Sequence, residues 1–188
     1  MATTKAGEKS LGAIELLIQD HKKVQKMFKD FEKLGEGDEE EKLALVTQCC
    51  TELKIHSQIE EEIFYPAARE AINADDILDE AEVEHASVAD LIDQIQAMEP
   101  SDDLYDAKFT VIGEFTNHHI KEEQDEMFPK VKKAKIDLAA LGQELMQRKL
   151  ELQEEMGVLE EDRDDEAARR KSASRSKSQP AAYAKSKE

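Results

Sequence analysis

The sequence predicts an all-α protein: an antiparallel up-down-up-down four-helix bundle with an additional C-terminal helix and a disordered tail. Gly and Pro are scarce, at 7 and 4 of 188 residues, which favours helices and leaves few turns for a sheet. Apolar residues recur in steps of three and four along four segments, the spacing of an amphipathic helix face. The segments are separated by short polar turns, which join antiparallel neighbours in helical bundles.

The first predicted helix covers residues 11–34, and a Gly-Glu-Gly turn at 35–37 ends it. One position on its apolar face has no apolar residue, and His21 stands at that position. A lone histidine on an apolar face is most often a hydrogen-bonded core residue, so this position alone does not indicate a ligand.

The second predicted helix runs from about residue 38 to Ala71, and its core side carries both His56 and Glu60. Four-residue spacing places these two side chains about one turn apart on the same face. A carboxylate on that side is costly unless it is paired or coordinated. Pro66 follows the motif and should disturb the helix just beyond it.

The third predicted helix, about Asp75 to Met98, again has a histidine, His85, at the one position of its apolar face without an apolar residue. The fourth begins after Glu99-Pro100-Ser101 and repeats the four-residue spacing with His119 and Glu123. Its predicted buried face also includes Phe115. Each predicted bundle helix therefore has one histidine on its buried side.

The chain has the pattern of a duplication. His85 follows His21 by 64 residues, and His119 follows His56 by 63. Each copy is a helical hairpin with a lone histidine on its first helix and His-x-x-x-Glu on its second. Two such hairpins would pack as one bundle with an internal pseudo-twofold axis.

Composition divides the chain into a flexible N-terminus (1–10), the bundle (11–135), an additional helix (136–161) and a disordered basic tail (162–188). The formal net charge of −18 argues against nucleic acid as a partner of the folded part, although the basic tail could contact it. No segment has the length and apolar composition of a membrane span or a signal peptide. We therefore expect a cytoplasmic protein without a membrane partner, and the oligomeric state stays open.

The four buried faces should bring together four imidazoles and two carboxylates, namely His21, His56, Glu60, His85, His119 and Glu123. This donor set suits a pair of metal ions, with iron the leading candidate and manganese or zinc possible. Each ion could take two histidines while Glu60 and Glu123 bridge the pair. Six protein groups around two ions leave coordination positions unfilled.

These residues resemble the hemerythrin-like or HHE cation-binding domains, whose pattern is His, then His-x-x-x-Glu, then His, then His-x-x-x-Glu. The resemblance covers about residues 11–132 and includes the Phe-Tyr-Pro and Met-Phe-Pro sequences after the two motifs. It implies a four-helix bundle with a non-haem di-iron centre. Oxygen-carrying hemerythrins have a fifth histidine one turn after the third-helix histidine, where this chain has Ala89, so its iron would be more open.

The leading interpretation is a di-iron protein that binds dioxygen or a related small oxidant, for oxygen or iron sensing, storage or oxidative-stress protection. An alternative is a di-iron enzyme that turns over peroxide or nitric oxide at the open positions. A further alternative is a helical protein-interaction adaptor without metal. The sequence assigns no catalytic residue and no cofactor beyond the metal.

Other polar side chains near the motifs have simpler expected roles. His118 lies about 100° around the helix from His119 and should be partly exposed. Glu61 should be surface, although a neighbouring glutamate of this kind can hydrogen-bond a ligand imidazole. Tyr65 is interpreted as packing, and Cys49 as a small buried apolar residue.

Overall fold

The computed structural model describes residues 11–35 and 37–158. The predicted flexible N-terminus and disordered tail lie outside the described residues, as do the last residues of the predicted additional helix. Contacts divide the chain into two compact units, Met1–Lys149 and Leu150–Glu188. The bundle and the candidate site belong to the first unit.

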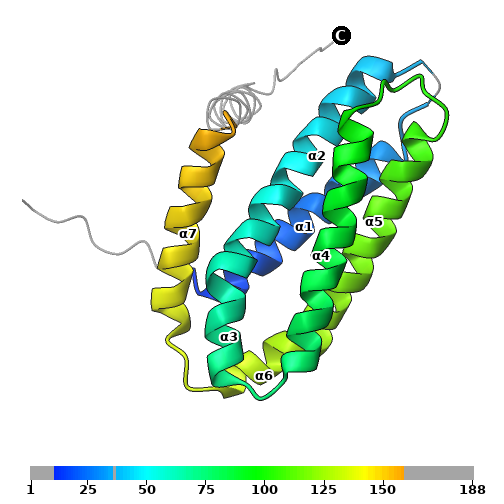
Figure 1. Ribbon diagram of the computed structural model, residues 1–188. Coiled ribbons are helices and arrows are strands. Elements are labelled where there is room, and N and C mark those ends of the chain that lie inside the picture. The colour runs from blue at the N-terminus through cyan, green and yellow to red at the C-terminus, as the bar shows by residue number, and fades with distance from the viewer. Residues whose placement is uncertain (1–10, 36, 159–188) are drawn as a thin grey trace, which may run out of the picture. The chain divides into compact units, whose positions relative to one another are not determined.

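Every regular element in the described ranges is helical, as the sequence predicts (Figure 1). None of these helices is both long enough and apolar enough to cross a membrane. The elements are α1 (Ala13–Phe31), α2 (Glu39–Ile59), η1 (Glu60–Phe64), α3 (Tyr65–Ala71), α4 (Asp75–Gln96), α5 (Tyr105–Glu122), η2 (Glu123–Met127), α6 (Phe128–Lys133) and α7 (Leu138–Glu155).

Four long helices form the bundle, because α1 packs against α2 and α5 while α4 packs against α5 and α2. Short turns make α1–α2 and α4–α5 the two hairpins that the duplication predicts. Their apolar faces meet in one core, to which Val24, Phe28, Leu53, Val88, Ile92, Phe109 and Ile112 contribute among others.

The prediction that Phe115 is buried is wrong, because its side chain is 46 % exposed and Thr116 is buried in its place. The rotation of α5 explains the difference. Gly113 of α5 faces Phe28 of α1 so closely that an added Cβ would lie 3.1 Å from the phenylalanine ring. This close approach turns Phe115 to the edge of the packed face and Thr116 into the interior.

The structure sharpens the prediction that Pro66 disturbs the second helix. The π-helical turn η1 begins at Glu60 and ends two residues before Pro66. The second turn, η2, begins at Glu123 and ends two residues before Pro129. Proline has no N–H and clashes with the carbonyl four residues earlier, so a wider turn accommodates it. Each turn adds a residue directly after a candidate metal ligand, and so changes which side chains face inward.

Candidate metal centre

All six predicted ligand residues are buried, with relative exposures from 0 to 7 %. The histidines come one each from α1, α2, α4 and α5, and the glutamates are the first residues of η1 and η2. The structure therefore brings together all the side chains that the sequence selects, which are His21, His56, Glu60, His85, His119 and Glu123.

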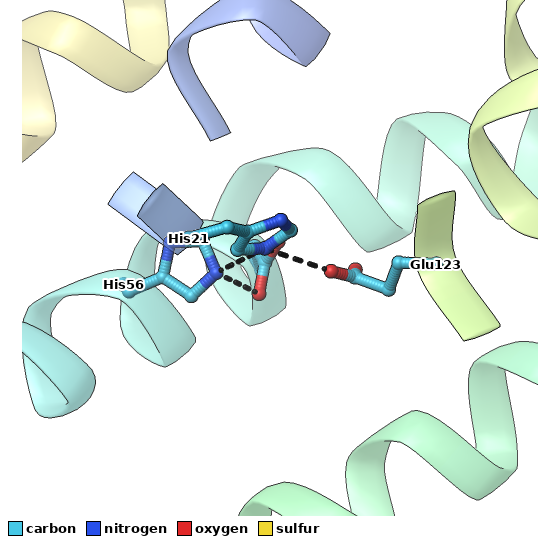
Figure 2. Close-up of side chains that lie close together, drawn as sticks. His21, His56 and Glu123 are labelled. Carbon is cyan, nitrogen blue, oxygen red and sulfur yellow. Dashed lines mark hydrogen bonds and ion pairs between the residues drawn. The ribbon is translucent and has the colours of Figure 1, made fainter. Parts of the chain in front are cut away.

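The first group of donor atoms is built mainly by the first hairpin. His21 Nε2 lies 3.0 Å from His56 Nε2 and 3.1 Å from Glu123 Oε2. His56 Nε2 also lies 3.2 Å from Glu60 Oε2. Figure 2 shows His21 contacting both His56 and Glu123, which belong to helices distant in sequence.

The second group belongs mainly to the second hairpin. His85 Nε2 lies 3.1 Å from His119 Nε2 and 3.5 Å from Glu60 Oε2. His119 Nε2 lies 3.6 Å from Glu123 Oε2. Both glutamates thus reach both histidine pairs, which is the arrangement that bridging carboxylates require.

The outward-facing Nδ1 atoms of His85 and His119 contact carboxylates from neighbouring helices. Glu61 Oε1 lies 2.8 Å from His85 Nδ1, and Glu84 Oε2 lies 2.9 Å from His119 Nδ1. An ionised carboxylate only accepts hydrogen bonds, so both Nδ1 atoms carry the proton and donate. Such contacts fix the tautomer and the orientation of metal-binding histidines. Glu61 therefore makes the contact with a candidate ligand imidazole that the sequence analysis allowed for such a surface glutamate.

The other two histidines also have polar neighbours at Nδ1. The side-chain amide of Gln124 lies 3.0 Å from His21 Nδ1. Asp20 Oδ2 lies 3.6 Å from His56 Nδ1, and the other oxygen of Asp20 pairs with Lys149. Burial favours the protonated form of Asp20, but the neighbouring His56 ring and the charge of Lys149 outweigh it and lower its pKa.

The two Nε2 atoms of His85 and His119 are the clearest indication that the site is made for a cation. In the neutral form with the proton on Nδ1, each ring presents a lone pair at Nε2, and these atoms are only 3.1 Å apart. Two lone pairs at that distance repel each other unless a cation lies between them. Glu60 Oε1 is also buried without a hydrogen-bond partner among the described residues, so this donor set fits a metal.

Burial and mutual repulsion shape the acid–base behaviour of the cluster. Burial raises the pKa of Glu60 well above its usual value, and the nearby charge of Glu123 raises it further. Burial also lowers the pKa of His56 to about 4, despite its contact with Asp20. A neutral imidazole at neutral pH is the form that binds metal.

Tyr65 is the residue of this site that the sequence analysis missed. Its hydroxyl lies 3.2 Å from Glu123 Oε1, 3.5 Å from Glu60 Oε2 and 3.4 Å from Nε2 of both His85 and His119. The η1 turn places Tyr65 here, five residues after Glu60, and periodicity based on a regular α-helix does not predict that position.

The duplicated counterpart of Tyr65 is Phe128, five residues after Glu123. The Tyr65 ring stacks on His85 at 5.6 Å, and the Phe128 ring stacks on His21 at 5.9 Å. The repeated aromatic position after each motif was thus the available sequence signal. Only one of these two aromatic positions has a hydroxyl.

A small cavity lies among the four histidines. Its volume is about 20 Å³, which leaves room for about one water molecule or a ligand of two heavy atoms. Its other lining residues are mostly apolar and include Val24, Leu53, Val88 and Ile120. Ala89, where the family resemblance places a fifth histidine, is exposed, and Val88 lines the cavity.

The remaining candidates lie outside this cluster. The His118 side chain is 61 % exposed and contacts Glu122 and Glu84 at 3.2 and 3.6 Å, in agreement with the partly exposed position predicted. Cys49 and Cys50 are both buried and reduced. Burial raises the pKa of the Cys50 thiol to about 12, so these cysteines are unreactive core residues.

Comparison with known proteins places these observations in a family context. The sequence model of the protein family described as hemerythrin HHE cation binding domain matches residues 12–131 of this chain. A solved structure of a hemerythrin HHE cation binding domain-containing protein from Mycobacterium kansasii is similar in fold, with a TM-score of 0.67 and 24 % sequence identity. The match covers 77 % of this chain and 89 % of that chain. The comparison with curated proteins gave no match.

Proposed function

This chain belongs to the hemerythrin HHE cation-binding domain family, and we propose that its buried histidine and glutamate cluster is the metal-binding centre, which holds two iron ions and binds dioxygen or a related small oxidant. His21 and His56 would hold one ion, and His85 and His119 the other. Glu60 and Glu123 reach both pairs and would bridge the two ions. The biological role would be sensing, storage or protection against oxidants.

The observation that carries this proposal is the close approach of two histidine Nε2 atoms in each hairpin half, at 3.0 and 3.1 Å, with buried carboxylates between the halves. Imidazole and carboxylate together suit iron, although manganese and zinc accept the same donors. Bound iron would supply redox chemistry and exchangeable coordination positions. The chain supplies fixed donor atoms, and the adjoining apolar cavity has room for a molecule the size of dioxygen.

Metal analysis of the purified full chain tests the proposal. We expect about two irons per chain, together with near-ultraviolet absorption that changes when dioxygen is admitted to the reduced protein. A chain that takes up a single ion, or one whose loaded form ignores dioxygen, peroxide and nitric oxide, would contradict it. Retention of full stability without any metal would favour the metal-free adaptor instead.

The Tyr65 hydroxyl favours a second candidate function, the turnover of peroxide. A phenol within 3.2 to 3.5 Å of both glutamates can donate a proton to a ligand that reacts there. Burial, together with the charges of Glu123 and Glu60, raises the pKa of Tyr65 well above its usual value, so the proton stays on the phenol at neutral pH.

The Tyr65→Phe variant should consume peroxide about 10²-fold more slowly, the contribution typical of a positioned proton donor. Its iron content should stay unchanged, because the ring remains and the metal-binding groups are intact. Peroxide consumption per iron is the measurement. Tyr105→Phe is the matched control, since Tyr105 is equally buried but belongs to the apolar core away from the centre. Equal rates for the two variants would rule out a role for the Tyr65 hydroxyl.

A further inference from the structure

The cavity beside the histidines is lined by pairs of positions that the duplication relates. Val24 and Val88 each follow a lone histidine by three residues, and both line the cavity. Leu53 and Thr116 each precede the histidine of a His-x-x-x-Glu motif by three residues, and both line it as well. Two differences break the symmetry of the wall, because Thr116 stands where the first hairpin has Leu53, and Ser57 stands where the second hairpin has Ile120.

Thr116 is buried to 94 %, and its Oγ1 has no hydrogen-bond partner among the described residues. A helical threonine or serine commonly bonds to the carbonyl four residues earlier, and two exposed residues, one in α5 and one in α4, do so. Thr110 Oγ1 bonds to the carbonyl of Asp106, and Ser87 Oγ bonds to that of Val83. Thr116 instead leaves its donor unused in the cavity wall, at a cost in stability that an apolar side chain would avoid.

We propose that the Thr116 hydroxyl is the specificity-determining hydrogen-bond donor to a diatomic ligand in this cavity. This inference rests on the proposed function, because it assigns the polar contact of the same ligand site. The ligand class is a molecule of two heavy atoms that accepts a hydrogen bond, such as dioxygen or nitric oxide. The cavity volume of about 20 Å³ limits the ligand to this size.

The chemistry of the wall supports a donor at this point. The other non-ligand residues that line the cavity are mostly apolar, so water competes poorly for the hydroxyl of Thr116. A hydrogen bond in a site of low polarity is stronger than one in water. Glu84 and Ser57 also line the cavity, but Glu84 contacts His119 and Ser57 is only partly buried, so Thr116 supplies the buried hydroxyl of a largely apolar wall. Such a wall admits a small apolar molecule, and the donor fixes its orientation.

The test uses the full chain loaded with iron(II) and nitric oxide as the probe, with its dissociation constant measured by anaerobic titration. Thr116→Val keeps the shape but removes the donor, so nitric oxide should bind about three- to tenfold more weakly, the worth of one hydrogen bond. Thr116→Ser keeps the donor and should stay within about twofold of the unsubstituted protein. Thr110→Val makes the same change on the exposed side of α5 and should have no effect.

Metal content and melting temperature accompany each titration. Thr116→Val should keep its iron, and without metal it should melt no lower than the unsubstituted chain, because it loses an unpaired buried hydroxyl. Equal nitric oxide affinity of the Thr116→Val variant and the unsubstituted protein would overturn the inference and leave the proposed function standing. An equal loss of affinity in Thr116→Ser would also overturn it. Failure of the unsubstituted, iron-loaded chain to bind nitric oxide would overturn both.

Discussion

Removal of the metal should lower the melting temperature of the chain by about 10 °C at neutral pH. A ligand present at a thousand times its dissociation constant stabilises the folded state by about 4 kcal/mol. For a chain of this length, each kcal/mol corresponds to roughly 2–4 °C. Calorimetry of the loaded and chelator-treated protein at several metal concentrations measures the effect. Coincident melting curves at all concentrations would exclude a cation as a stabilising part of the fold.

The Glu60→Gln substitution should stabilise the metal-free protein at neutral pH but destabilise the metal-loaded protein. The pKa of Glu60 is raised in the fold, so ionisation of this carboxyl opposes folding once the pH exceeds its unfolded value near 4.5. Metal-free protein should therefore lose stability as the pH rises above about 5, and the Glu60→Gln variant should lose less. With metal present the same variant should be less stable, because a neutral amide is a poorer ligand. Glu126→Gln changes an exposed residue of η2 and should follow the unsubstituted protein in both states.

Gly142→Val should destabilise the chain by about 1–3 kcal/mol, the usual range for overpacking. A Cβ at Gly142 would lie 2.4 Å from the carbonyl oxygen of Leu11 and 2.7 Å from the amide nitrogen of Ala13. These are backbone atoms, so no side-chain rotation relieves the clash. Helix propensity alone predicts the opposite sign, because glycine is a poor residue inside a helix such as α7.

The midpoint of urea unfolding measures the effect of Gly142→Val. Gly12→Ala is the control, since its new methyl group would lie 3.6 Å from the nearest non-adjacent atom, the carbonyl oxygen of Leu138. A Gly142→Val midpoint equal to or above that of the unsubstituted chain would show that the start of α1 and the first half of α7 do not pack as described.

The histidines and glutamates of the site were predictable because they follow helical periodicity. Each helix has one histidine among the apolar residues of its buried face, and this pattern repeats after 63 or 64 residues. Pairing of the helices therefore brings together His21, His56, His85 and His119. The same reasoning failed at Phe115, where the close contact of Gly113 with Phe28 decides the rotation of α5. Periodicity predicts which face of a helix is apolar. It does not specify the rotation of the helix about its axis closely enough to decide which of two adjacent residues is buried.

The side chains around the ligands were harder to predict for a different reason. Glu84 reaches His119 from α4, and Lys149 reaches Asp20 from α7. Such contacts depend on the separation and rotation of two helices, which no pattern within one helix records. Tyr65 escaped prediction because the π-helical turn after Glu60 departs from the regular spacing on which the prediction depended.

The tyrosine and phenylalanine that occupy matching positions after the two motifs make the duplicated halves unequal. Tyr65 contacts both glutamates and both histidines of the second hairpin, while Phe128 presents only a ring to His21. A gene duplication that began with two interchangeable half-sites would in this way have produced a division of labour. The half with Phe128 presents an apolar ring to its histidine, and the half with Tyr65 has a hydroxyl that can donate a proton.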